Sequence, residues 1–158
     1  MLTSVDLFAG CGGLSRGLEA AGFGCIAFNE INDDAAQSFQ TNFEESYRVH
    51  GDIKDVLSRD GIRKEVIPIT GGDEIDLVCG GPPCQGFSGI GHRRSYTIEK
   101  GDIPTNDLYW DMIRVIEQIR PKAFLFENVA GLLTCAKNLL DESTYLLNNP
   151  DEAMELGK

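Results

Sequence analysis

The stretch Asp6-Leu7-Phe8-Ala9-Gly10-Cys11-Gly12-Gly13 decides the fold class of this chain. It joins a short predicted strand at residues 3–8 to a segment in which Leu14, Leu18 and Ala21 recur at helical spacing. A strand that enters a glycine turn and then a helix is typical of the first unit of a parallel α/β sheet. Glycines at this turn let a ligand approach the backbone closely. Because no Lys-Ser/Thr pair follows them, the P-loop motif is excluded.

Strands and helices alternate along the rest of the chain. Strands are predicted at residues 25–28, 47–49, 75–79 and 123–126, and helices at 14–21, 33–42, 54–60 and 106–118. The remaining segments are predicted to be loops at 61–74 and 85–105, a further helix at 129–148 and a frayed tail at 149–158. This alternation predicts a doubly wound, mostly parallel sheet with strand order 3-2-1-4-5. Ligands bind such sheets outside the carboxyl ends of the strands, between strands one and four.

Composition limits the function classes. The 158 residues, 42% hydrophobic and 25% charged, suit one globular domain. No apolar run approaches the ~20 residues of a membrane span, and the first residues lack a signal-peptide pattern, so we expect a cytoplasmic protein. Five cysteines without a C-x-x-C pair disfavour a disulfide framework or a zinc site. The net charge of −11 conflicts with a chain that binds nucleic acid by itself, because phosphate neutralisation dominates that binding.

Two acidic residues at predicted strand ends are candidates for binding a small molecule. Glu30 stands about 20 positions after Gly10, the spacing at which an acidic residue commonly binds the hydroxyl pair of a ribose. Asp52 could accept a hydrogen bond from an adenine amino group, with Ile53 packing on the ring. The alternative for Asp52 is a helix N-cap, a position that Asp favours.

Two further segments carry candidate catalytic groups. In Gly80-Gly81-Pro82-Pro83-Cys84-Gln85, two prolines stiffen the approach to a thiol, and positive charge from His92-Arg93-Arg94 on the same predicted loop would make it a nucleophile. A buried, inert cysteine is the alternative, but burial does not explain the prolines and glycines around Cys84. Glu127 follows an apolar strand, where desolvation would raise its pKa and let it donate a proton. The alternative is a solvated carboxylate beside a helix cap at Asn128.

In order and spacing, these clusters resemble the successive motifs of the cytosine carbon-5 DNA methyltransferases. The matching elements are Asp6–Gly13, Asn29-Glu30, Gly51-Asp52-Ile53, Gly81–Ser88 and Glu127-Asn128-Val129. They cover most of residues 2–133. The resemblance implies a Rossmann-like, S-adenosylmethionine-dependent methyltransferase fold that is incomplete at the C-terminus. Residues 1–148 would form the N-terminal part of the catalytic domain.

The same resemblance implies the chemistry. The Cys84 thiolate would add to carbon 6 of a flipped cytosine, Glu127 would support the addition at ring nitrogen 3, and carbon 5 would take the methyl group of S-adenosylmethionine. The residues implied to contact the cofactor are Phe8, Cys11, Gly13, Glu30, Ile31, Asp52, Ile53, Pro83 and Leu108. Those implied to contact DNA are Gln85, Ser88, Arg93 and Arg94. The chain departs from the pattern at Thr105, where an arginine often precedes Asn106, and at Ile31, where many relatives have tryptophan.

The chain is shorter than members of that family usually are. The Gln-x-Arg-x-Arg motif, the target-recognition domain and the segment that completes the cofactor site are missing from it, and with them much of the basic surface that contacts DNA. We therefore expect double-stranded DNA as the substrate, at the bacterial nucleoid, and a second chain or missing C-terminal half as partner. We expect no DNA methylation by this chain alone, whether it is a natural split subunit, a truncated reading frame or an engineered fragment.

Three other functions are weighed against this interpretation. A branch of the same family methylates transfer RNA with the same motifs, although the Gly-Gly-Pro-Pro-Cys-Gln-Gly-Phe-Ser form here looks more like the bacterial DNA enzymes. A cofactor-binding or regulatory subunit without catalysis would suit the short chain but not the presence of both Cys84 and Glu127. Amino-group methyltransferases carry Asp, Asn or Ser before Pro-Pro, where this chain has Gly81. The sequence leaves open a role in restriction–modification, mismatch repair or regulation.

Overall fold

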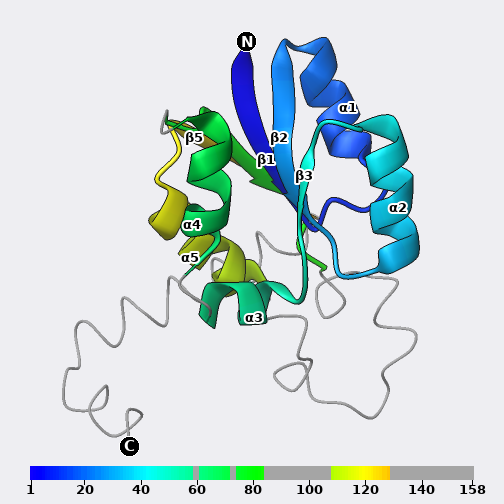
Figure 1. The fold of residues 1–158 in the computed structure, drawn as a ribbon. Helices are drawn as coiled ribbons and strands as arrows, with labels where there is room; N and C mark the ends of the chain where they lie inside the picture. Colours follow the sequence, from blue (N-terminus) through cyan, green and yellow to red (C-terminus); the bar gives the residue numbers. More distant parts are fainter. Residues whose placement is uncertain (59–60, 72–73, 84–107, 129–158) are drawn as a thin grey trace, which may run out of the picture. The chain divides into compact units, whose positions relative to one another are not determined.

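The sheet of the computed structural model has the predicted topology. The structure describes residues 1–58, 61–71, 74–83 and 108–128. Its strands are β1 (Leu2–Leu7), β2 (Phe23–Asn29), β3 (Tyr47–Val49), β4 (Leu77–Gly80) and β5 (Ala123–Phe126). All neighbouring pairs are parallel and their order is β3-β2-β1-β4-β5, which confirms the doubly wound prediction (Figure 1). The register pairs Leu7, the last residue of β1, with Gly80, the last residue of β4.

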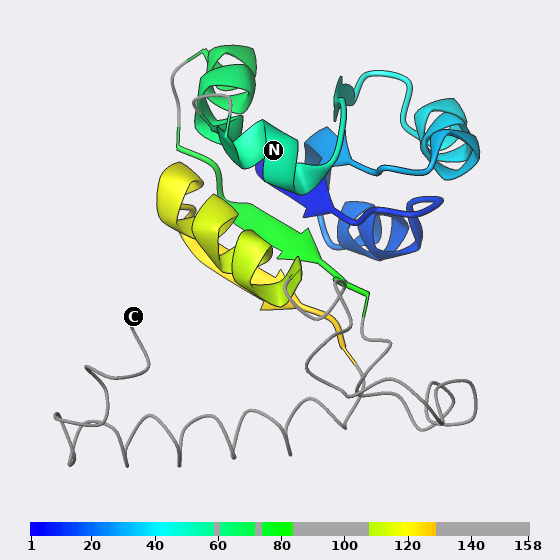
Figure 2. The same ribbon diagram turned by 90° about the horizontal axis from the view of Figure 1, so that it is seen from below.

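Helices cover both faces of the sheet (Figure 2). On one face lie α1 (Gly13–Ala20) and α2 (Asp33–Asn42); on the other lie α3 (Ile53–Ser58), α4 (Ile62–Val66) and α5 (Leu108–Ile119). Side chains alternate along a strand, so β1 serves both faces. Val5 and Leu7 join the larger core with α3, α4 and α5. Asp6 faces the other side, where it meets α1.

The predicted loop at residues 61–74 is wrong. The structure has α4 there, followed by a 3-10 helix, η1 (Ile67–Thr70). Ile62 and Val66 lie one helical turn apart and are both fully buried in the larger core, which stabilises this short helix. Pro68 lies in the first turn of η1 and Gly71 ends it with a φ of +69°. The proline and the glycine thus belong to a helix start and a helix end, which proline and glycine favour.

Most other predicted boundaries agree with the structure. The helix at 33–42 and the strands at 47–49 and 123–126 are confirmed as predicted. The strand predicted at 75–79 begins two residues later, at Leu77, and the last described helix extends to Ile119. The predictions for residues 85–105, for Thr105 and Asn106, and for residues 129–158 lie outside the described residues. No helix in the described part of the chain has the length and apolarity needed to cross a bilayer.

A carboxylate ties three strands together at the edge of the sheet remote from their carboxyl ends. Asp76, just before β4, accepts hydrogen bonds from the Thr3 backbone N–H at 2.7 Å and from the Lys122 Nζ at 2.8 Å. Thr3 belongs to β1, and Lys122 directly precedes β5. The hydrogen bond from Lys122 is the largest contribution that lowers the pKa of Asp76.

This carboxylate predicts acid sensitivity. A carboxyl whose pKa is lowered by folding contributes stability above its unfolded pKa and loses it as the pH falls through the folded value. We expect the free energy of unfolding to decrease below about pH 4. Asp76→Asn should lower stability at neutral pH and flatten that decrease, which urea unfolding across this pH range would show. Glu45→Gln, which changes an exposed carboxyl, is the control; an unchanged pH profile in Asp76→Asn would contradict the assignment.

Candidate functional site

The turn after β1 has a strained backbone. We call residues 8–13 the glycine loop. Gly10 and Gly12 have φ values of +54° and +91°, and Phe8 has a φ of +56°, which is uncommon for a bulky residue. Such strain persists only where the surroundings fix it, and it concentrates at functional sites. The glycine loop therefore has a defined shape at the carboxyl end of the central strand, where the fold places ligands.

Aromatic side chains of α2 and β2 support the glycine loop from one side. A Cβ on Gly12 would lie 2.7 Å from the Phe43 ring and 3.0 Å from the Phe39 ring, so only glycine fits there. Phe39 in turn stacks on Phe28 with ring centroids 3.9 Å apart. By contrast, a Cβ on Gly10 or Gly13 would meet nothing within 4 Å. The loop is thus packed at Gly12 and open at Gly10 and Gly13.

Glu30 holds the glycine loop from the end of β2. Its Oε2 accepts a hydrogen bond from the Gly10 N–H at 2.9 Å, and its Oε1 accepts one from the Asn32 N–H at 2.8 Å. Sequence spacing predicted that Glu30 and the glycine turn lie together, and these contacts confirm it. Each oxygen retains a second lone pair, so the fixed carboxylate can still accept hydrogen bonds from a ligand. Next to it, the Ile31 side chain is 65% exposed, and Cys11 is exposed on the loop itself.

Asn29 positions the turn after β3, a role that the sequence analysis missed. Its side chain is buried, and its Nδ2 donates to the Val49 carbonyl at 2.8 Å and to the Gly51 carbonyl at 3.0 Å. The ends of β2 and β3 are thereby tied together just before Asp52. The signal available in the sequence was an asparagine at the end of a predicted strand. Its side-chain amide has two N–H donors and can therefore bind two backbone carbonyls of a neighbouring turn.

The residues after that turn are partly engaged in the fold. Asp52 Oδ1 accepts a hydrogen bond from the Lys54 N–H at 2.9 Å, as expected of the alternative interpretation, a helix cap at the start of α3. The Ile53 side chain is 2% exposed and packs in the larger core. A contact of Ile53 with a ligand would therefore be made by its backbone.

The ends of β4 and β5 bring Glu127 beside the Gly80-Gly81 pair. The Glu127 N–H donates to the Gly80 carbonyl at 3.0 Å, and a Cβ on Gly81 would lie 2.8 Å from Glu127 Oε2. Gly81 thus makes room for a carboxylate at the edge of the sheet that also carries the glycine loop. Glu127 is exposed here, so the described residues do not form the apolar surroundings predicted for it.

The other predicted site residues divide into two groups. Pro83 is exposed directly after Pro82, and Leu108 begins α5 and packs partly against the larger core. The residues that lie outside the described ranges are Cys84, Gln85, Ser88, Arg93 and Arg94. The predicted nucleophile thus follows the described segment by one residue.

Three buried polar side chains lie beneath the glycine loop. Asp6 and Ser15 are each 1% exposed, and Cys79 is fully buried. Burial raises the pKa of Asp6 to about 6, although the hydrogen bond from Ser15 opposes the rise. Burial also raises the pKa of the Cys25 and Cys79 thiols, which keeps both protonated. Both thiols therefore act as structural side chains rather than as nucleophiles.

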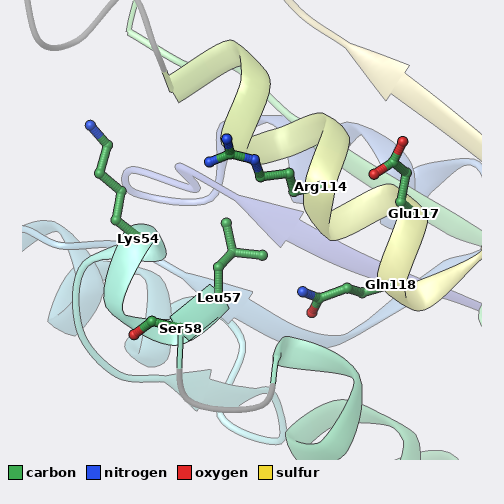
Figure 3. Close-up of a pocket in the computed structure, with 6 residues that line it drawn as sticks. All are labelled: Lys54, Leu57, Ser58, Arg114, Glu117 and Gln118. Atoms are coloured by element: carbon green, nitrogen blue, oxygen red, sulfur yellow. The ribbon is translucent and has the colours of Figure 1, made fainter. Parts of the chain in front are cut away.

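A surface cavity of about 420 Å³ lies between α3 and α5, away from these residues (Figure 3). It is lined by Lys54, Leu57, Ser58, Arg114, Glu117 and Gln118. A second cavity of about 420 Å³ lies between α2 and β3, beside Asp33, Arg48 and His50. No predicted site residue lines either cavity. Among the described residues, the predicted site residues lie mostly at the carboxyl ends of the strands.

Comparisons with known proteins agree with this fold. The sequence model of the C-5 cytosine-specific DNA methylases matches residues 2–149. The chain is 37% identical over 134 residues to the type II methyltransferase M.NgoPII of Neisseria gonorrhoeae, which covers 85% of this chain and 35% of that protein. It is 41% identical over 128 residues to the type II methyltransferase M.XorII of Xanthomonas oryzae pv. oryzae, covering 81% and 28%.

A solved structure gives the same result. An E. coli prophage-encoded protein described as a DNA modification methyltransferase superposes with a TM-score of 0.68 at 31% identity, covering 94% of this chain and 38% of that one. The methyltransferase fold predicted from the sequence is thereby confirmed. The chain spans about a third of the length of these relatives. The chain belongs to the C-5 cytosine-specific DNA methylase family.

Proposed function

We propose that this chain supplies the cofactor site and the nucleophile of a DNA cytosine carbon-5 methyltransferase. The observation that carries the proposal is the arrangement at one edge of the sheet. The glycine loop and Glu30 follow β1 and β2, while Gly81 and Glu127 follow the neighbouring strands β4 and β5. A cofactor-binding carboxylate and a catalytic carboxylate would then share the edge at which doubly wound sheets bind ligands.

Family membership implies S-adenosylmethionine as the methyl donor, and the residues at this edge fit it. Glu30 is held by two backbone N–H groups with lone pairs left for a ribose. Open space above Gly10 and Gly13 allows a ligand to approach the backbone. Ile31 offers an exposed apolar side chain for the adenine. The other proposed contacts are Phe8, Cys11, Asp52, Ile53, Pro83 and Leu108.

The proposed chemistry assigns one task to each catalytic residue. The bound cofactor supplies the methyl group. The Cys84 thiolate adds to carbon 6 of a cytosine that has left the duplex, which makes carbon 5 nucleophilic. Glu127 hydrogen-bonds or protonates ring nitrogen 3 during that addition. After methyl transfer, a base such as water takes the proton from carbon 5, the bond between carbon 6 and sulfur breaks, and the Cys84 thiolate leaves, which restores the ring.

Double-stranded DNA is the proposed substrate, within a bacterial restriction–modification system in the cytoplasm, because the relatives are type II methyltransferases. We further propose that residues 1–148 form the N-terminal part of the catalytic domain and that DNA contacts are completed by a C-terminal part or second chain. Two features support this. The net charge is −11, and β5 is an outer strand among the described residues, with Phe124 61% and Leu125 40% exposed. Within this chain, Gln85, Ser88, Arg93 and Arg94 are the proposed DNA contacts.

Calorimetric binding of S-adenosylhomocysteine tests the cofactor site. Ile31→Ala should weaken binding about tenfold, because it removes apolar surface that the adenine would bury. It should leave the melting temperature unchanged, since the side chain is exposed. Glu30→Ala is less informative, because Glu30 also holds the glycine loop.

Ile69→Ala is the matched control for this experiment. Ile69 is also exposed, at 42%, and lies in η1, remote from the carboxyl ends of the strands. The Ile69→Ala variant should bind S-adenosylhomocysteine with the affinity of the wild type. Equal weakening by both replacements, or none by Ile31→Ala in a chain that binds the ligand, would remove Ile31 from the site. A folded chain that does not bind the ligand would count against the proposed cofactor site.

A further inference from the structure

A buried hydrogen bond closes the base of the glycine loop. The Ser15 Oγ donates to Asp6 Oδ2 at 2.6 Å, and both residues are 1% exposed. The buried Cys79 thiol beside it donates to the Val5 carbonyl at 3.5 Å. Burial of a carboxylate is costly unless it is hydrogen-bonded, so the sheet tolerates Asp6 because the Ser15 hydroxyl is in place.

The two residues flank the glycine loop in the sequence. Asp6 precedes Phe8 by two residues, and Ser15 follows Gly13 by two residues, so their hydrogen bond joins the ends of the loop. Within the loop, the Gly10 N–H donates to Glu30 and the Gly12 N–H donates to the Ala9 carbonyl at 2.9 Å. The loop is therefore held at a half-buried point by Glu30 and at a fully buried point by Asp6.

We propose that Asp6 and Ser15 are positioning residues that hold the glycine loop, from the buried side of the sheet, in the shape that receives the cofactor. The identity of the ligand rests on the proposed function, whereas the effect on the loop itself does not. Neither side chain reaches the surface, so their influence on binding is exerted through Phe8 to Gly13. Phe8, Gly10 and Gly12 have positive φ values, so the loop needs such support to keep its shape.

The charge state of Asp6 gives this role a pH signature. The pKa of Asp6 is raised to about 6 by burial, with a smaller rise from the Glu30 charge. The titratable groups that face it are Glu30 and Cys25 from β2 and its end, and Cys79 from β4; the α1 neighbour, Ser15, does not titrate. The carboxylate accepts the hydrogen bond from the Ser15 hydroxyl more strongly than the neutral acid does, so the loop should be held best above about pH 6.

The effect on global stability has the opposite sign. A carboxyl whose pKa is raised by folding contributes stability that is present below its unfolded pKa and is lost as the pH rises through about 6. On acidification, the Asp6 contribution to the free energy of unfolding therefore rises while the loop becomes looser. A residue with a purely structural role would change loop order and stability in the same direction.

Amide hydrogen exchange of Gly10 and Gly12 in the cofactor-free chain tests the proposal directly. Relative to intrinsic rates, Ser15→Ala should speed exchange of both amides about tenfold near pH 7.5. Asp6→Asn should do the same and remove the pH dependence of exchange between about pH 5.5 and 7.5. Ser38→Ala, which removes an exposed helical serine hydroxyl from α2, is the matched control and should leave these amides unchanged.

Binding of S-adenosylhomocysteine to the full chain provides the second readout. Wild-type affinity should fall about fivefold to tenfold from about pH 7.5 to 5.5, and Asp6→Asn should show a weak, pH-independent affinity. Unchanged glycine exchange in Ser15→Ala, which removes only a hydroxyl, would overturn the proposal even if Asp6→Asn fails to fold. Faster exchange in a chain whose wild type does not bind the ligand would keep the positioning role and overturn the cofactor assignment.

Discussion

Replacing Cys84 by serine is expected to abolish covalent capture of DNA that contains 5-fluorocytosine. In the proposed mechanism the Cys84 thiolate adds to carbon 6, and after methyl transfer the fluorine on carbon 5 cannot leave as a proton would, so the adduct would persist. A serine hydroxyl is a far weaker nucleophile, and we expect adduct formation to slow by at least about 10³-fold. The measurement is denaturing electrophoresis of labelled duplex with S-adenosylmethionine, in the presence of the C-terminal part of a type II relative's catalytic domain.

Three controls make this result specific. Cys25→Ser changes a thiol of β2 outside the proposed site and should retain the adduct. Glu127→Gln removes an ionisable group that supports the addition and should slow it by about 10²- to 10⁴-fold. Wild-type chain without the complementing part should give neither adduct nor methylated DNA. An adduct that persists in Cys84→Ser would exclude this residue as the nucleophile, whereas capture of transfer RNA in place of DNA would change the substrate.

Gly80→Ala is expected to destabilise the fold severely, because the added methyl group would collide with a neighbouring strand. A Cβ on Gly80 would lie 2.5 Å from the Leu7 carbonyl oxygen, a backbone atom of β1. The two residues are paired in the register of β1 and β4, so the contact cannot relax without breaking the centre of the sheet. We expect a loss of about 3 kcal/mol or more, a large share of the ~5–15 kcal/mol typical of a domain.

Gly17→Ala is the matched control for this loss. Gly17 lies inside α1 with nothing within 4 Å of a Cβ built there, so alanine should stabilise the chain by about 0.5–1 kcal/mol through helix propensity. Urea unfolding of the two variants should therefore shift the midpoint in opposite directions. If Gly80→Ala unfolds at the wild-type midpoint, β1 and β4 are farther apart than the structure places them.

Local patterns predicted the order of the sheet because each strand and its helix carry their own signals. The helix at 33–42 is one example, since Asn32 caps it through the Ala35 N–H and its buried residues, Ala36 and Phe39, are spaced for one face. The helices at 62–70 were missed because their apolar side chains pack on residues that are distant in the sequence, in α5 and in the strands. Proline and glycine at their ends suggested a loop when those contacts were unknown.

The site was predicted less completely than the fold, for a physical reason. Spacing placed Glu30 beside the glycine loop, because that pair follows from strand order. The contact of Glu127 with Gly81 was not predicted. Asp6 was seen only as part of the loop motif, since its burial depends on α1 covering the second face of β1. The burial of Ile53 has the same origin, because its side chain meets a core formed by distant segments.

The outer position of β5 has a consequence for the aggregation of this protein in the cell. β5 pairs with β4 on one side only, within the described residues, and its Phe124 and Leu125 side chains are 61% and 40% exposed. An exposed apolar edge strand is a template for pairing with strands of other chains. Copies that accumulate with this edge uncovered would aggregate, so soluble yield should depend on chaperones or on simultaneous synthesis of whatever covers β5.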